Sequence, residues 1–207
     1  MFTLVIGPMM AGKTSLIRYK IVREIKAKQD VILVCFDGML ARWAEEKKEK
    51  DATLAKVTHD GGGYLGESIH DPLERQRLHV LYTANLQPSN SQLAQLLKLY
   101  PKAMVILDEI QFFQPGETEA FLKRELENRS LLGVGLNLDW KKQMFPTIVM
   151  CFGYANQVKQ KRATCSRCGK KANFTQRVLN AADEKEQLNV VDICAKYEPR
   201  CFICFNK

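Results

Sequence analysis

The sequence predicts an α/β fold in which a mainly parallel sheet is flanked by helices and a small metal-binding lobe follows at the C-terminal end. Three observations lead to this expectation. Short apolar runs alternate with amphipathic stretches, a glycine-rich turn follows the first apolar run, and two closely spaced cysteine pairs occur late in the chain. The 207 residues suffice for one main domain and an appendage, which we place at residues 1–150 and 151–207.

Four strands are expected from short apolar runs bounded by charged residues, glycine or proline. They cover residues 2–6, 31–36, 104–107 and 131–136. These runs are almost continuously apolar, which is typical of parallel strands that are buried on both faces. A sheet covered on both sides therefore follows.

Three helices are expected between these strands. The first follows the glycine-rich turn and has apolar residues at helical spacing as far as Ile25. The second covers residues 91–100 after Asn90 as a cap, and the third covers residues 117–129 after Pro115. Strands that alternate with helices in this way favour a doubly covered parallel sheet.

Composition places the chain among ordinary folded proteins. It has 46% hydrophobic and 26% charged residues, which argues against a disordered chain. Its formal charge of +8 would suit a nucleic acid, but a site for nucleotide phosphates explains the excess equally well. No apolar run reaches the ~18 residues of a membrane span, and no signal peptide is apparent, so we expect a cytoplasmic protein without a membrane partner.

The glycine-rich turn has the pattern Gly-x-x-x-x-Gly-Lys-Thr, which is the phosphate-binding loop of P-loop NTPases. Backbone amides between its glycines wrap phosphates, Lys13 brings charge to the β and γ oxygens, and the Thr14 hydroxyl suits Mg²⁺. A strand before it and a helix after it are the setting that the motif requires. The main domain is thus predicted to be a RecA-like P-loop NTPase fold. The predicted nucleotide-binding loop residues are Gly7, Pro8, Met9, Met10, Ala11, Gly12, Lys13 and Thr14.

Asp108 and Glu109 follow the third apolar run, at the strand end where open α/β sheets bind ligands. Asp108 suits the Mg²⁺ shell. Glu109 is expected to point the other way along the pleat and to act as the catalytic base. Asp108, Glu109 and Gln111 complete the predicted nucleotide-binding set.

Two further features leave alternatives open. Phe112 and Phe113 follow the carboxylates and could either stack on a base or plug the core. Asp60, before a run of three glycines, is a tentative Mg²⁺ ligand, but a surface turn explains it equally well.

The late cysteines form two Cys-x-x-Cys pairs separated by a 32-residue insert. Two such knuckles supply four thiolates in the tetrahedral arrangement that Zn²⁺ prefers, and no open position indicates catalysis by the metal. Redox-active thiols are the alternative. We therefore predict a closed structural zinc site that orders a small lobe. Its ligands are Cys165, Cys168, Cys201 and Cys204.

These motifs occur in an order that resembles the zinc-containing type II thymidine kinases, the family of the cellular cytosolic enzyme. The resemblance covers nearly the whole chain. It rests on the phosphate loop, the Asp-Glu-x-Gln-Phe-Phe run, the four cysteines, Arg42-Trp43, Thr58-His59-Asp60, Thr175-x-Arg177 and Tyr197.

The resemblance implies Mg²⁺-dependent transfer of the γ-phosphoryl group of ATP to the 5′-hydroxyl of thymidine or deoxyuridine, giving dTMP for DNA precursor synthesis. It also implies a zinc-tied lasso that closes over the nucleoside, and a homo-oligomer, in this family a tetramer. Zinc is accordingly expected to support the nucleoside side more than the ATP side. The implied substrate-binding residues are Phe112, Trp140, Phe145, Thr175, Leu188, Val190 and Tyr197.

Several positions depart from the family pattern. The family usually has aspartate where Asn137 stands, and Trp140 replaces its smaller aromatic residue. Other departures are Met144, Gly62, Gln160 and the Asp192-Ile193 pair.

A second function class uses several of the same motifs. A P-loop ATPase with a zinc ribbon that acts on nucleic acid would also explain the loop, the carboxylates and the basic residues 159–171. It would show nucleic-acid-stimulated ATP hydrolysis, whereas a kinase consumes a nucleoside stoichiometrically with ATP.

Overall fold

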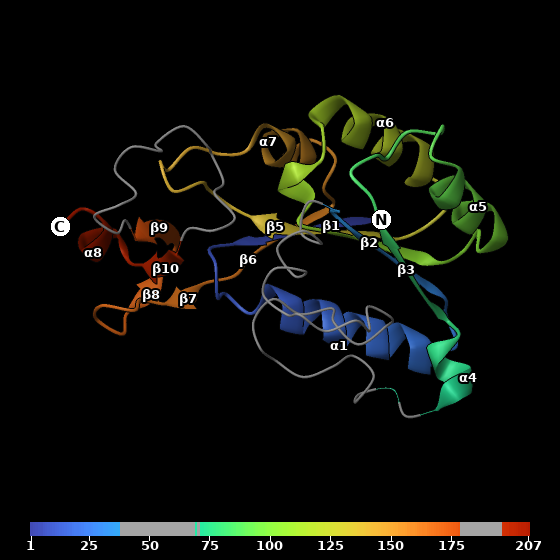
Figure 1. Ribbon diagram of the computed structural model, residues 1–207, viewed down its shortest axis with the longest axis horizontal. Coiled ribbons are helices and arrows are strands. Elements are labelled where there is room, and N and C mark those ends of the chain that lie inside the picture. The colour runs from blue at the N-terminus through green and yellow to red at the C-terminus, as the bar shows by residue number, and fades with distance from the viewer. Residues whose placement is uncertain (38–68, 70, 179–195) are drawn as a thin grey trace.

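A computed structural model describes residues 1–37, 69, 71–178 and 196–207 (Figure 1). Its main sheet has six strands in the order β3-β2-β4-β5-β1-β6, and every neighbouring pair is parallel. The predicted mainly parallel sheet is therefore confirmed. The strands are β1 Phe2–Gly7, β2 Val31–Cys35, β3 Leu78–Tyr82, β4 Met104–Asp108, β5 Leu131–Leu136 and β6 Gln157–Gln160.

Helices cover both faces of this sheet (Figure 1). Helix α1 and the short α4 lie on one side, and α5, α6 and α7 lie on the other. None of the helices in the described ranges is long and apolar enough to cross a bilayer. The helices are α1 Lys13–Lys26, α4 Pro72–Arg75, α5 Ser91–Leu99, α6 Pro115–Glu125 and α7 Pro146–Phe152.

The buried side chains form one apolar cluster on each face of the sheet. Along β1, Leu4 and Ile6 belong to the cluster beneath α5, α6 and α7, whereas Val5 belongs to the cluster beneath α1. This alternation follows from the two-residue period of a strand. On the second face, Ile17 and Ile21 of α1 bury their side chains completely, as the helical spacing predicted.

The register brings the ends of the central strands to the same edge. Gly7 at the end of β1 pairs with Leu136 at the end of β5. On the other side of β5, Asp108 at the end of β4 pairs with Val134. The phosphate loop and the predicted carboxylates consequently leave the sheet at one edge, with β5 between them.

A small lobe made mostly of short strands lies at one end of the molecule (Figure 1). Its strands pair antiparallel, β7 with β8 and β9 with β10. The lobe consists of β7 Ala163–Thr164, β8 Lys171–Ala172, β9 Phe174–Val178, β10 Lys196–Arg200 and helix α8 Phe202–Phe205.

The sequence did not predict β3, β6 or α7. All four residues of β6 are exposed, and Val158 is the one apolar residue among them, so no apolar pattern marks this strand. The strand forms because the edge of β1 is available for pairing. The division after residue 150 stays a prediction. Since β6 follows it and still pairs with β1, we propose a boundary after β6 instead.

Gly133 in β5 provides a test of how tightly the sheet packs. A Cβ at this position would lie 2.7 Å from Cδ1 of Ile110 and 3.1 Å from the ring of Phe2. We expect Gly133→Ala to lower the free energy of unfolding by about 1–3 kcal/mol through overpacking, measured by chemical denaturation. Gly116→Ala is the matched control, because a Cβ there meets nothing within 4 Å. Equal stabilities of the two variants would contradict this packing.

Candidate active site

The phosphate loop runs from Gly7 at the end of β1 into the first turn of α1, as predicted. Met10 and Gly12 both adopt left-handed backbone conformations, with φ of 60° and 70°. Left-handed residues in such a turn curl successive amides toward one point, which suits an anion. The buried Lys13 ammonium donates to the carbonyls of Gly7 at 3.2 Å and Pro8 at 2.8 Å, so its charge lies along the loop itself.

Strand β4 ends at Asp108, and Glu109 is the residue where the chain turns away. Glu109 has φ 52° and ψ 44°, and its amide donates to Oδ1 of Asp108 at 3.0 Å. The pleat alternation that the sequence suggested for Glu109 therefore does not apply, because the residue lies outside the strand. A left-handed conformation costs a non-glycine residue about 1–2 kcal/mol, and such residues often occur at active sites.

Gln111 connects the Glu109 carboxylate to the neighbouring strand. It lies in the short 3₁₀ turn Ile110–Phe112 and is buried. Its Nε2 donates to Oε2 of Glu109 at 2.6 Å, and its Oε1 accepts from the Leu136 amide at 3.0 Å. Gln111 was predicted to bind nucleotide, and here it positions a predicted catalytic group.

Two groups that the sequence did not point to lie beside the carboxylates. Burial, then Cys35 and Asp108, raise the pKa of Tyr82 to about 12. Burial, then Asp108 and Glu109, raise the pKa of Cys35 as well. Both side chains are therefore neutral at physiological pH, and Asp108 lies close enough to both to contribute to each shift. Only the recognition of β3 as a strand could have indicated Tyr82, since it ends that strand.

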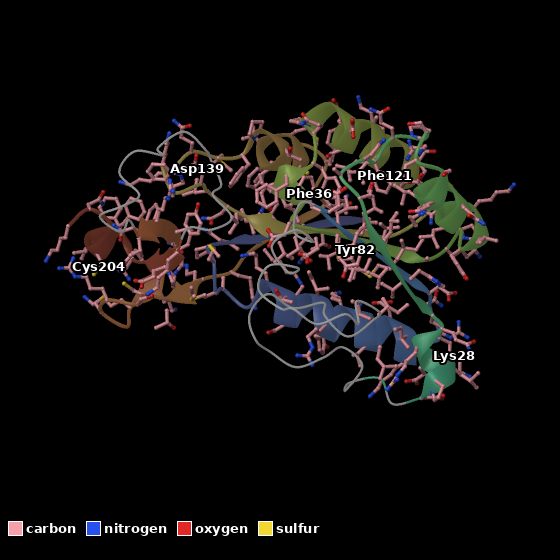
Figure 2. The ribbon with its side chains drawn as sticks, in the orientation of Figure 1. Lys28, Phe36, Tyr82, Phe121, Asp139 and Cys204 are labelled. Atoms are coloured by element: carbon pink, nitrogen blue, oxygen red, sulfur yellow. The ribbon has the colours of Figure 1, made fainter. Side chains whose placement is uncertain are left out.

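The two adjacent phenylalanines have different environments. Phe113 is fully buried in the core, whereas Phe112 is partly buried against it. The Phe112 ring lies 5.5 Å from the ring of Phe36 and 6.2 Å from that of Phe145. Phe36 appears above the sheet in Figure 2. Phe113 is therefore a core residue, which is one of the two alternatives that the sequence left open. Phe112 presents a partly exposed aromatic surface.

Trp140 lies in a tight turn after β5. The buried Asp139 carboxylate (labelled in Figure 2) accepts from the amides of Lys141 and Gln143, both at 2.8 Å. These two bonds fix the turn. The Lys141 ammonium lies 5.0 Å and the Arg177 guanidinium 5.9 Å from the centre of the Trp140 ring. The ring thus sits between the main domain and β9.

Thr175 and Tyr197 lie on β9 and β10 and are both buried. The Thr175 hydroxyl accepts from the amide of Met9 at 3.1 Å, which joins the lobe to the phosphate loop. Tyr197 pairs with Arg177 across the two strands. The remaining predicted residues, Asp60, Leu188 and Val190, lie outside the described ranges.

The four predicted zinc ligands lie together. Their sulfur atoms are all within 4.8 Å of one another, and those of Cys168 and Cys201 are 3.6 Å apart. A tetrahedral site with metal–sulfur distances of ~2.3 Å places its sulfurs about 3.8 Å apart, so the cluster has the size that Zn²⁺ requires. The first knuckle turns at Gly169, which has a φ of 73°.

The thiols of this cluster are not equivalent. Burial opposes ionisation of Cys165, but hydrogen bonds from the amides of Cys201, Arg167 and Cys168 outweigh it and lower its pKa. Burial and the neighbouring thiols raise the pKa of Cys204. Four thiolates at this spacing repel one another, so a divalent cation is the group that would hold them together.

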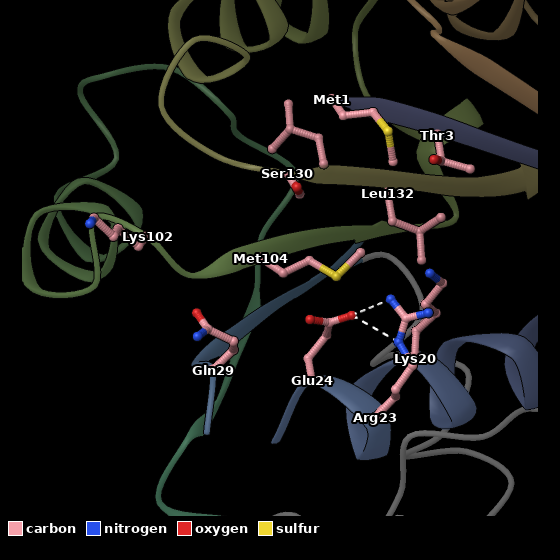
Figure 3. Close-up of a pocket in the computed structure, with 11 residues that line it drawn as sticks. Met1, Thr3, Lys20, Arg23, Glu24, Gln29, Lys102, Met104, Ser130 and Leu132 are labelled. Carbon is pink, nitrogen blue, oxygen red and sulfur yellow. Dashed lines mark hydrogen bonds and ion pairs between the residues drawn. The ribbon is translucent and has the colours of Figure 1, made fainter. Parts of the chain in front are cut away.

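A cavity of about 280 Å³ lies at the opposite edge of the sheet, where the strands begin (Figure 3). Lys20, Arg23 and Lys102 are among its lining residues, and Arg23 is paired with Glu24 at 2.6 Å. None of the predicted site residues lines it. The phosphate loop and the carboxylates of Asp108 and Glu109 lie instead at the carboxyl edge of the sheet.

Comparison with known proteins identifies the family. A family model described as Thymidine kinase matches residues 75–205, which include both carboxylates and all four cysteines. The chain belongs to the thymidine kinase family. The matched residues begin after the phosphate loop, so the assignment of the loop depends on its sequence pattern and its geometry.

Three relatives named Thymidine kinase illustrate this similarity. The protein of Amsacta moorei entomopoxvirus is 24% identical over 204 residues, covering 98% of this chain and 96% of its own. That of Pyrobaculum aerophilum is 25% identical over 203 residues, covering 97% and 96%. That of Mesoplasma florum is 27% identical over 209 residues, covering 98% and 89%.

Among solved structures, a chain described as an ATPase domain matches 65% of this chain and 56% of its own length, with a TM-score of 0.41 and 15% identity. That similarity is too distant to support an inference about this thymidine kinase family member, whose fold is established by its own strand order.

The cysteine cluster predicts the metal content. The purified chain should carry about one zinc ion, because four thiolates complete a tetrahedral shell, and Cys204→Ala should lose most of it. Cys151→Ala is the control, since Cys151 is buried in the main core away from the cluster. Zinc can be quantified by atomic absorption after gel filtration. Full zinc retention in Cys204→Ala would contradict the assignment.

Proposed function

We propose that this chain is an ATP-dependent thymidine kinase that transfers the γ-phosphoryl group of ATP to the 5′-hydroxyl of thymidine, giving dTMP for DNA precursor synthesis. One observation carries the proposal. In a member of the thymidine kinase family, a phosphate loop and a positioned carboxylate, Glu109, meet at one edge of a parallel sheet. Deoxyuridine as a further acceptor stays a prediction.

On the donor side, the amides of residues 7–14 would bind the phosphates of ATP, and Lys13 would turn from its own loop carbonyls to the β and γ oxygens. Thr14 and Asp108 are the residues that would hold Mg²⁺, with Asp60 as a further predicted ligand. When bound, Mg²⁺ neutralises charge on the β- and γ-phosphates. Asp108 and Glu109 are adjacent in the chain at the end of β4, and paired carboxylates at one edge would favour a cation there.

On the acceptor side, we assign the nucleoside base to the aromatic surfaces beside the carboxylates. Phe112, Phe145 and Trp140 contribute rings from two separate segments, and Thr175 and Tyr197 contribute polar groups from the lobe. Leu188 and Val190 are predicted to complete this wall. A pocket of rings with few polar groups excludes water, which would otherwise compete with the nucleoside hydroxyl for the phosphoryl group.

Glu109 is the proposed catalytic base. Gln111 donates to its Oε2 and so holds the carboxylate, which would accept the proton of the 5′-hydroxyl. The nucleoside oxygen then bonds to the γ phosphorus as the bond from that phosphorus to the bridging oxygen breaks, and ADP leaves with the electron pair. The left-handed backbone and the Gln111 contact hold the carboxylate in place before substrate binds.

The nucleic-acid ATPase remains the competing function, and the basic residues 159–171 are its main support. Membership of the thymidine kinase family favours the kinase. A cytoplasmic location and a homotetramer stay predictions.

Removing the base tests the proposed chemistry. Glu109→Gln keeps the shape of the side chain and a partner for Gln111, but it cannot accept the proton. We expect kcat to fall by about 10²–10⁴-fold, with ATP binding retained, in an assay of dTMP formation from labelled ATP. Glu127→Gln, an exposed change just beyond the C-terminal end of α6, is the control. An unchanged kcat in Glu109→Gln would refute its role.

The aromatic wall predicts a selective loss of acceptor binding. Trp140→Ala should raise the KM for thymidine by roughly 10- to 100-fold because a large ring surface is lost, while the KM for ATP changes by less than about twofold. Trp140→Phe keeps a ring and should recover most of the loss. Steady-state kinetics with each substrate varied separately measure both values. Equal effects on the two substrates would exclude Trp140 from the nucleoside pocket.

A further inference from the structure

The small lobe is connected to the phosphate loop at two points, indirectly through Asn137 and directly through Thr175. At its start, the Gly7 carbonyl accepts from the Asn137 amide at 3.4 Å, and the Asn137 side chain donates to the Asn173 carbonyl, next to β9, at 2.9 Å. In its middle, the Met9 amide donates to the Thr175 hydroxyl at 3.1 Å. Thr175, which is 166 positions from Met9 in the sequence, therefore holds the backbone of the loop in place.

The next part of the loop belongs to the apolar cluster that contains the metal ligands. Ala11 is buried in the small apolar cluster of the lobe, and three of the other five members of that cluster are zinc-ligand cysteines. A Cβ on Gly7 would approach Ala11 to 3.2 Å and the Lys161 carbonyl to 2.7 Å. The loop is therefore confined between α1, the chain leading into the lobe and the cysteines.

The position of Thr175 depends on the metal cluster through a short route. Thr175 in β9 pairs with Pro199 in β10, and Cys201 follows directly after that strand. The Pro199 carbonyl also accepts from the amide of Ser166, which lies between the first two cysteines. Both knuckles of the metal site thus hold the strand that carries the partner of Thr175.

We propose that the zinc lobe forms a wall of the donor site, and that Thr175 and Ala11 are positioning residues that pass the order of the metal centre to the phosphate loop. The proposal rests on ATP as the donor of the proposed function. Loss of zinc would free β10 and then Thr175, and it would remove the surface beneath Ala11, so the loop amides would lose their arrangement. The sequence alone assigned zinc to the nucleoside side, whereas these contacts extend its effect to ATP.

The hydroxyl of Thr175 can be tested without nucleoside. Thr175→Val keeps the shape and removes the acceptor for the Met9 amide, whereas Thr175→Ser keeps the acceptor. In calorimetric titrations of the full zinc-loaded chain with Mg²⁺ and adenylyl imidodiphosphate, Thr175→Val should bind about three- to tenfold more weakly than wild type. Thr175→Ser should bind within about twofold of wild type. Zinc content should remain unchanged in both variants.

Unchanged analogue affinity in zinc-loaded Thr175→Val would overturn the role of Thr175. Wild-type chain stripped by a chelator gives the second measurement. Its affinity for the analogue should fall and recover when zinc is restored, and an unchanged affinity in the metal-free chain would overturn the coupling. A wild-type chain that shows this zinc dependence but forms no dTMP would refute only the proposed function.

Discussion

The parallel register of β1, β5 and β4 is the constraint on which the candidate site depends. Because Gly7 pairs with Leu136 and Asp108 pairs with Val134, three strands end at one edge of the sheet. That edge places the phosphate loop opposite the carboxylates, and it brings the Leu136 amide within reach of Gln111. A slip of one residue would send the side chains of a strand to the other face, so the two apolar clusters enforce the register of the chemistry as well.

Glu109 combines a backbone that is costly with contacts that make it stable. Its left-handed conformation ends the strand abruptly and turns the carboxylate out of the pleat. The Asp108 carboxylate accepts its amide, and the buried Gln111 side chain holds one of its oxygens. Hydrogen bonds to a charged group are worth about 1.5–3 kcal/mol each, so the two bonds together offset the cost of about 1–2 kcal/mol for the left-handed backbone. The strain is thus compatible with a stable fold and fixes the direction of the carboxylate.

The sequence predicted those elements whose formation is determined by their own residues. It did not predict the features that depend on contacts with distant parts of the chain. Strands β1, β2, β4 and β5, helix α1, the phosphate loop and the cysteine knuckles each carry their own signal of period or spacing. Strand β6 carries none, because its residues are exposed and its pairing is supplied by β1. Phe112 and Phe113 are adjacent residues of the same type, so the sequence does not distinguish them. The 3₁₀ turn between β4 and α6 determines that Phe113 is the buried one. The hydrogen bond from the Met9 amide to the Thr175 hydroxyl joins two distant segments, and the sequence of neither segment indicates it.

The small lobe is too small to be stable on its own. Two two-stranded sheets and a helical turn bury little apolar surface, so a lobe of this size needs a metal or a neighbour. The structure provides for both, because the cysteines form the centre of the cluster and Ala11 of the main domain completes it. A side chain larger than alanine at position 11 would press on the metal ligands, and a displaced ligand set would in turn press on the loop. The phosphate loop and the lobe therefore stabilise each other. Ala11 of the loop is part of the core of the lobe, and the lobe is part of the wall of the phosphate site.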